Sequence, residues 1–126
     1  NQMETHVFNQ QRKLREVMQE YGTELMAWGP FAEGRNDFFT NGTLAAIGVK
    51  YGKSVAQVAL RFLIQRGIIV IPKSTHKERM IENFNVFDFS LTEREMTVIA
   101  ALDNEKSLFF SHYDPEMVKW LINYVK

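Results

Sequence analysis

Three short stretches of the chain, one strand-like and two apolar, predict strands. They cover residues 2–5, 24–28 and 68–71, and the last two runs are continuously apolar between glycine and proline residues. Continuous apolar runs of this length are typical of parallel strands that are buried on both faces. The sequence therefore favours a parallel sheet.

Helical signals fill the intervals between the runs and continue after the third. The predicted helices cover residues 10–21, 43–51, 54–65, about 75–83, 92–102 and 114–125. The apolar stripe of the first helix consists of Leu14, Val17, Met18 and Tyr21. Ser54 is expected to be an N-cap, and Thr92 with Glu95 forms a capping box.

This alternation of strands and helices predicts an α/β fold with right-handed crossovers. A closed (β/α)8 barrel needs eight strands and roughly 250 residues, so three strands would be about the last third of one. The chain lacks an initiator Met and opens directly in a strand-like stretch, which suggests a segment of a longer protein. We expect one domain over residues 1–126.

Composition narrows the function classes. Apolar residues make up 45% of the chain, with ten Phe and no Cys, which favours a packed core without disulfides. Fifteen basic residues balance fifteen acidic ones, so the field that attracts nucleic acid is absent. No window reaches the roughly 18 apolar residues of a membrane span. We expect a cytoplasmic protein that binds neither nucleic acid nor membrane.

The sharpest chemical feature follows the third apolar run, where Pro72 ends the strand and Lys73 and Ser74 lead into a helix that carries Arg79. Backbone N–H groups at a helix N-terminus bind anions, and the two cations and the hydroxyl add charge and donors. Barrel enzymes often hold phosphate after their last two strands. The alternative is that Lys73 and Arg79 are solvated and that Ser74 or Thr75 only caps the helix.

Three landmarks in order resemble the aldo-keto reductase family. Residues 1–4 look like its sixth barrel strand, residues 28–31 (Trp-Gly-Pro-Phe) like the seventh strand and its loop, and residues 71–74 (Ile-Pro-Lys-Ser) like the eighth. Glu82 and Asn83 continue the match, which runs to about residue 120. Trp-Gly-Pro in place of the commoner Tyr-Ser-Pro resembles the bacterial 2,5-diketo-D-gluconate reductase branch. The resemblance implies the C-terminal portion of a (β/α)8 TIM barrel, about strands 6–8 with their helices and the tail.

The resemblance also implies a site for NADP(H). Gln2 would hydrogen-bond the nicotinamide carboxamide and Trp28 would stack on the nicotinamide ring; without the resemblance, a strand-end Gln and a core Trp would explain both. The pyrophosphate would lie along backbone groups of Phe31, Ala32, Glu33 and Gly34, in a stretch that also includes Gly29 and Pro30. The 2′-phosphate, and with it a preference for NADPH, would fall to Lys73, Ser74, Thr75 and Arg79, and the adenine to Glu82 and Asn83.

The resemblance places no catalytic residue in this chain. The family's proton-donating Tyr and the Lys, Asp and His that support it come from the first half of the barrel, so the isolated chain is expected to be inactive. His6 is expected in a surface or packing role, and His76 and His112 in exposed or cofactor-flanking ones. No spacing among the histidines and acids suggests a metal site.

Several aromatic residues leave a choice open. Phe109 and Phe110 could lie over the substrate mouth, as the resemblance implies, or could only pack helices against the barrel wall. Trp120 poses the same choice, and so do Phe38 and Phe39.

The main functional hypothesis is reduction of aldehydes or ketones to alcohols in the complete enzyme. Its partners would be a small carbonyl substrate and either the missing N-terminal barrel half or a second copy. One alternative is a non-catalytic, self-associating fragment, because an open piece of barrel exposes sheet edges. Another is a helix-turn-helix over residues 43–67, which the long apolar face of its second helix disfavours.

Overall fold

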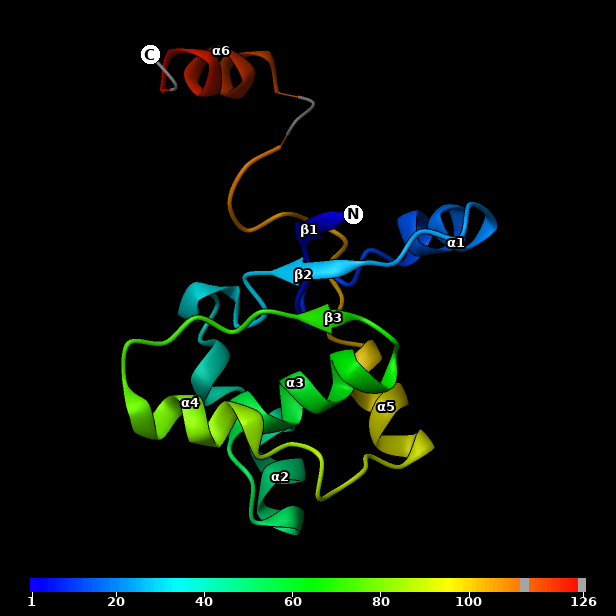
Figure 1. Ribbon diagram of the computed structural model, residues 1–126, viewed down its shortest axis with the longest axis vertical. Helices are drawn as coiled ribbons and strands as arrows, with labels where there is room; N and C mark the ends of the chain where they lie inside the picture. Colours follow the sequence, from blue (N-terminus) through cyan, green and yellow to red (C-terminus); the bar gives the residue numbers. More distant parts are fainter. Residues whose placement is uncertain (112–113, 125–126) are drawn as a thin grey trace.

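The computed structural model describes residues 1–111 and 114–124 and shows a parallel sheet with helices packed on one side (Figure 1). The strands β1 (Gln2–Glu4), β2 (Met26–Trp28) and β3 (Ile69–Val70) lie in that spatial order. Both neighbouring pairs are parallel, as predicted. Each strand is shorter than the apolar run that predicted it.

Six helices of the described part match the predicted ones to within about two residues at each end. They are α1 (Arg12–Glu20), α2 (Gly42–Tyr51), α3 (Val55–Gln65), α4 (Lys77–Phe84), α5 (Glu93–Ala100) and α6 (Pro115–Tyr124). Ser54 caps α3, and Thr92 with Glu95 forms the capping box of α5, so both cap predictions are confirmed. The 3-10 turns η1 (Ala32–Gly34) and η2 (Phe38–Thr40) were not predicted.

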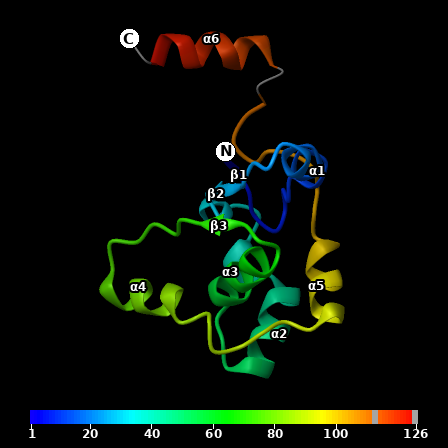
Figure 2. The same ribbon diagram turned by 45° about the vertical axis from the view of Figure 1, so that its right-hand side comes forward.

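The core lies between the sheet and α2, α3 and α5. Met3, Ala27 and Val70 are paired across the three strands and face this core. From the helical side, Phe62 and Leu63 of α3 are fully buried, in line with a helix whose apolar residues recur on one face. Both views show α2, α3, α4 and α5 on the same side of the sheet (Figure 2).

The opposite face of the sheet is open. Gln2 is exposed, and Ile69 and Ile71 are 46% and 48% exposed. The prediction that the apolar runs are buried on both faces is therefore wrong, because only one face is covered by helices. The open face is the one that would point into the interior of a closed barrel.

Two apolar stripes are less covered than the sequence predicted. In α1 only Met18 is buried, while Val17 and Tyr21 are 50% and 79% exposed. None of the described residues of α6 is buried, and this helix stands apart from the others in both views. Its Trp120 stacks on Tyr124 of the same helix, with ring centroids 5.2 Å apart. Trp120 therefore does not pack against the barrel wall, which was one of its two predicted roles.

None of the helices in the described ranges combines the length and the apolar content that crossing a bilayer requires.

Candidate cofactor site

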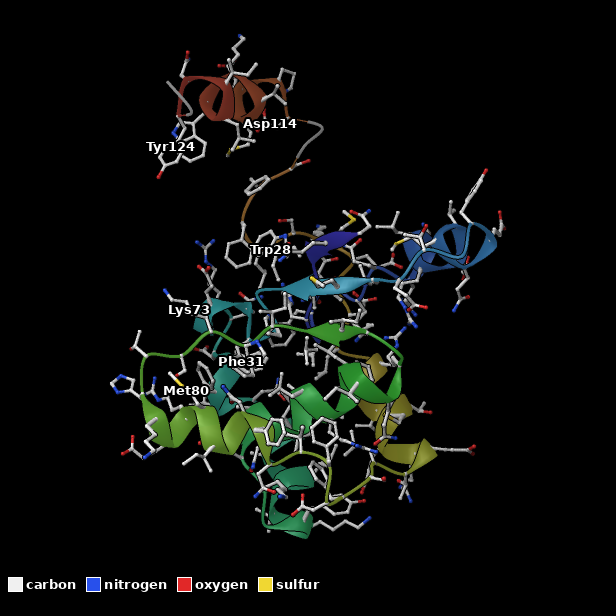
Figure 3. The ribbon with its side chains drawn as sticks, in the orientation of Figure 1. Trp28, Phe31, Lys73, Met80, Asp114 and Tyr124 are labelled. Carbon is white, nitrogen blue, oxygen red and sulfur yellow. The ribbon has the colours of Figure 1, made fainter. Side chains whose placement is uncertain are left out.

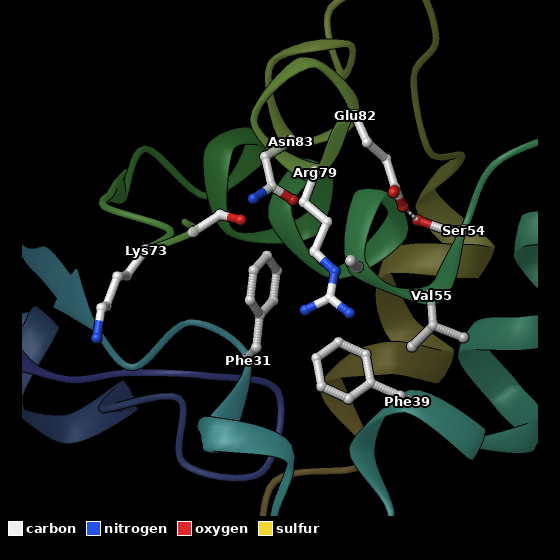
Figure 4. A pocket seen from close by; sticks show the side chains of 10 residues that line it. Phe31, Phe39, Ser54, Val55, Lys73, Arg79, Glu82 and Asn83 are labelled. Atoms are coloured by element: carbon white, nitrogen blue, oxygen red, sulfur yellow. Dashed lines mark hydrogen bonds between the residues drawn. The ribbon is translucent and has the colours of Figure 1, made fainter. Parts of the chain in front are cut away.

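A cavity of 340 Å³ lies at the carboxyl end of the sheet, between the segments that follow β2 and β3 (Figure 4). Its size is within the usual range of small-molecule sites. Its walls come from three regions far apart in sequence, which are the loop after β2, the start of α3, and the segment after β3 together with α4. The lining residues are Phe31, Phe39, Ser54, Val55, Ala56, Lys73, Ser74, Arg79, Glu82 and Asn83.

The helix α4 presents three polar side chains to the cavity. Arg79, Glu82 and Asn83 are three and four positions apart, so they share one face of the helix. Figure 4 shows Arg79 reaching from α4 toward the rings of Phe31 and Phe39. One wall therefore offers a cation, a carboxylate and an amide, and the facing wall offers two aromatic rings.

A hydrogen-bond network fixes Glu82. The Ser54 hydroxyl donates to Glu82 Oε1, and it also accepts the Gln57 amide at 3.2 Å as the N-cap of α3. Gln57 Nε2 donates to the carbonyl oxygens of Glu82 and Asn85, at 3.0 Å each. The start of α3 thus holds both the side chain and the backbone of Glu82.

The two cavity cations have no acidic partner in the part of the chain that the structure describes. Among these residues, neither the Lys73 ammonium nor the Arg79 guanidinium makes a hydrogen bond or ion pair, whereas Lys53 and Lys50 pair with Asp88 and Glu95. A cation at a cavity wall without an acidic partner is suited to bind an anion.

Ser74 has a local role that the sequence had left open. Its hydroxyl accepts the His76 amide at 3.1 Å, just before α4 begins at Lys77. The N-cap residue of α4 is His76, whose side chain makes no capping hydrogen bond. Ser74 therefore shapes the turn while lining the cavity, and Thr75 is exposed and lies outside the lining.

The predicted nicotinamide residues lie on the open face of the sheet. Gln2 pairs with Met26, and Glu4 pairs with Trp28. Gln2 and Trp28 are therefore two pairs apart and point to the same side of the sheet. The Trp28 ring meets Phe109 edge to face, with ring centroids 5.0 Å apart. Figure 3 shows Trp28, Lys73 and Phe31 following one another along one side of the molecule. The predicted cofactor residues thus extend from Trp28 to the cavity.

The loop between these two regions has an unusual backbone. Ala32, Glu33 and Gly34 all have positive φ, at 52°, 49° and 75°. The amides of Ala32 and Gly34 donate to the carbonyls of Gly29 and Phe31, at 2.8 and 2.9 Å. In this conformation, two of the backbone groups predicted to line a pyrophosphate are engaged within the loop.

His6 is fully buried, and both ring nitrogens are occupied. Nδ1 accepts the Phe8 amide at 3.2 Å, so Nε2 carries the proton and donates to Glu4 Oε1 at 2.9 Å. His6 has the packing role predicted for it. His76 is exposed at the start of α4, and His112 lies outside the described residues. Within the described ranges no group of three His, Cys, Asp or Glu is placed to hold a metal.

Four cavity residues were not predicted as cofactor-binding residues. They are Phe39, Ser54, Val55 and Ala56. The sequence did predict Ser54 as the N-cap of a helix, but it gave no indication of the hydrogen bond from Ser54 to Glu82. Of the adjacent aromatic pair, Phe38 is fully buried in the core, while Phe39 is 54% exposed and lines the cavity.

The fold and the cavity define a parallel α/β unit whose cavity, at the carboxyl end of its strands, is lined by Lys73 and Arg79. The sequence model of the Aldo/keto reductase family matches residues 1–104, and the chain belongs to this family. Its fold is the C-terminal portion of the family's TIM barrel, as predicted.

The chain spans about two fifths of the length of the similar proteins that it matches. The chain is 46% identical over 109 residues to 9,11-endoperoxide prostaglandin H2 reductase of Trypanosoma cruzi, which covers 86% of the chain and 38% of that protein. An aldo-keto reductase from a Medee basin deep-sea metagenome library has a TM-score of 0.86 at 38% identity, over 90% of the chain and 42% of that structure. A mutant of Gox0644, solved in complex with NADPH, has a TM-score of 0.83 at 34% identity, over 88% of the chain and 40% of that structure.

Proposed function

We propose that this chain forms the NADP(H)-holding part of an oxidoreductase that reduces aldehydes or ketones to alcohols. The observation that carries the proposal is the cavity in which Lys73 and Arg79, without acidic partners among the described residues, lie beside the rings of Phe31 and Phe39 and the polar ends of Glu82 and Asn83. A structural relative of 34% identity that was solved with NADPH supports it.

Each part of the cavity suits a part of the adenosine end. Lys73, Ser74 and Arg79 would hold the 2′-phosphate, because cations and a hydroxyl match its charge and its acceptor oxygens. The Phe31 and Phe39 rings would contact the apolar faces of the adenine, with Glu82 and Asn83 at its polar edge. Thr75 would add a hydroxyl at the rim. Discrimination between NADPH and NADH would therefore reside in the residues after β3.

The remainder of the cofactor would extend along the loop after β2. Gly29, Pro30, Phe31, Glu33 and Gly34 would adjoin the pyrophosphate. Trp28 would offer its ring face to the nicotinamide, and Gln2 would hydrogen-bond the carboxamide. When bound, the cofactor supplies the hydride that reduces the carbonyl carbon.

We assign no catalytic residue to this chain. Both nitrogens of its buried histidine, His6, are taken up by Glu4 and Phe8. The acid that protonates the carbonyl oxygen would come from other parts of the barrel, and the substrate would be a small carbonyl compound. A cytoplasmic location suits a chain without Cys.

Cofactor titration tests the proposal. We expect NADPH to bind more tightly than NADH, and Lys73→Ala and Arg79→Ala each to weaken NADPH binding about tenfold or more, since a charge-assisted hydrogen bond contributes about 1.5–3 kcal/mol. Arg94→Ala, which removes an exposed cation from α5, is the matched control and should change nothing. Equal affinity for the two cofactors in all four proteins would refute the proposed site.

A further inference from the structure

The carboxylate of Glu4 connects the end of β1 to the tail that follows α5. Glu4 is 6% exposed, and its Oε1 accepts the Leu108 amide at 2.9 Å in addition to His6 Nε2. The Ser107 hydroxyl donates to Oε2. Two donors that lie more than 100 residues away in sequence thus converge on one buried carboxylate.

These bonds outweigh the cost of burying the charge. Burial by itself raises the pKa of Glu4. The hydrogen bonds from His6, Ser107 and Leu108 lower the pKa by more than burial raises it, so the pKa lies below its usual value. The carboxylate is therefore stabilised as an anion by His6 and by the tail segment.

The same tail segment is held from its other side. Arg35 donates to the Leu108 carbonyl oxygen, and its guanidinium lies 4.3 Å from the centroid of the Phe109 ring. Ser107 Oγ also accepts the amides of Phe109 and Phe110, at 3.1 and 3.0 Å. The backbone of residues 107–110 is thus fixed in one turn.

The strand register explains why this turn lies over the nicotinamide end. Glu4 is paired with Trp28 across β1 and β2, so a segment bound to Glu4 is also beside Trp28. Phe109 meets the Trp28 ring edge to face, and a Cβ added at Gly29 would lie 3.8 Å from the Phe109 ring. The turn therefore covers part of the otherwise open face of the sheet.

We propose that Glu4 is a positioning residue, which holds residues 107–110 so that Phe109 forms an aromatic wall against Trp28 at the substrate end of the site. That this wall borders the substrate rests on the proposed function. The contacts from Glu4 to residues 107–110, and from Phe109 to Trp28, do not depend on a bound cofactor. A substrate with an apolar or aromatic group beside its carbonyl would contact the wall that Glu4 keeps in place.

Tryptophan fluorescence of the cofactor-free protein tests the linkage. Trp28 and Trp120 are the two tryptophans of the chain, so a Trp120→Phe background makes Trp28 the reporter. In that background we expect Glu4→Gln and Ser107→Ala each to raise acrylamide quenching of Trp28 about twofold, because the Phe109 ring would no longer shield one edge of the indole. Glu105→Gln, which removes an exposed carboxylate from the same tail, should leave quenching unchanged.

A double-mutant comparison separates positioning from a general loss of structure. Phe109→Ala should raise quenching by itself, and Glu4→Gln should add little to it, because both changes remove the same contact. If Phe109→Ala raises quenching and neither Glu4→Gln nor Ser107→Ala does, Glu4 is not the positioning residue.

Binding of adenosine 2′,5′-bisphosphate to the distant cavity reports on folding and on the proposed function. Retained binding in Glu4→Gln, together with increased quenching, supports the positioning role. Lack of binding in the parent protein would reject the cofactor site and leave the linkage test intact. Loss of binding in Glu4→Gln and in Ser107→Ala alike would overturn the inference, since both would then act on the whole fold.

Discussion

At the scale of single residues, Gly48 of α2 shows how closely the backbone packs around the helix pair. Gly48 is buried, and a Cβ at this position would lie 2.3 Å from the Lys53 carbonyl oxygen. That oxygen belongs to the backbone that leads into α3, so it cannot move away as a flexible side chain would. The absence of a side chain at Gly48 allows α2 and the start of α3 to approach each other.

We predict that Gly48→Ala destabilises the protein by about 1–3 kcal/mol, the usual cost of overpacking. Within an unobstructed helix the same change would be stabilising by about 1 kcal/mol. Gly42→Ala in the first turn of α2 is the matched control, because nothing lies within 4 Å of its added Cβ. Urea unfolding of both variants measures the difference, and equal stability changes would show that the Lys53 contact is unimportant.

Site residues could be predicted from the sequence where their pattern is local, and could not where they reach the cavity through contacts between distant segments. Lys73, Arg79 and Glu82 were identified because their chemistry and their family pattern are local in sequence. Phe39 and Val55 reach the cavity only because the loop after β2 packs against the start of α3, and no local pattern encodes that contact. The roles assigned to the predicted cofactor residues remain predictions until a ligand is measured.

At the scale of secondary-structure elements, one carboxylate joins α5 to α2. Glu95 Oε2 accepts the Thr92 amide at 2.8 Å as part of the capping box, and it also accepts the Tyr51 hydroxyl at 2.7 Å. Lys50 Nζ donates to Oε1 at 2.7 Å. Burial raises the pKa of Glu95, but these hydrogen bonds together lower it to about 2.

We predict that Glu95→Gln lowers the free energy of unfolding at pH 7 by about 1.5–3 kcal/mol, the contribution of a hydrogen bond to a charged group. Because the folded state lowers the pKa from 4.5 to about 2, the stabilisation is complete above pH 4.5 and is lost as the pH falls toward 2. The gap between the two proteins should therefore narrow over that range. Glu93→Gln, at an exposed position of the same first turn, serves as control. Urea unfolding at several pH values measures the gap, and one that does not change with pH would contradict the assignment to the carboxylate.

The ends of the helices were predicted better than the burial of the helix and sheet faces. Capping signals at Ser54 and Thr92 act within three residues, so the sequence reveals them directly. Whether a face is covered depends on other elements, which is why the exposure of β3 and of α6 could not be read from their own apolar patterns. The helix-turn-helix alternative is disfavoured by packing, because seven of the eleven residues of α3, its second helix, are buried.

At the scale of the whole molecule, the main exposed feature is the open face of the sheet. Ile69 and Ile71 are nearly half exposed there, and Met26 lies on the strand between those that carry Gln2 and Ile69. Apolar surface of this kind, beside the unpaired edges of β1 and β3 in the described sheet, favours association.

We predict concentration-dependent self-association at micromolar concentration, and a weaker tendency in Ile69→Thr, which keeps a β-branched side chain but reduces apolar contact. Sedimentation velocity measures both. Val49→Thr, on the exposed side of α2, is the control, because Val49 is 84% exposed and lies outside the sheet. A monomer at every concentration would count against the open face as an association surface.

The proposed function requires that the cavity between α3, α4 and the loop after β2 recognise a 2′-phosphorylated adenosine. The most direct measurement is calorimetric titration with adenosine 2′,5′-bisphosphate and with adenosine 5′-monophosphate, which isolates this end of the cofactor from the rest of the site. We predict that the bisphosphate binds more tightly and that Arg79→Ala removes the difference. Equal binding of the two nucleotides, or a preference that survives in Arg79→Ala, would contradict it.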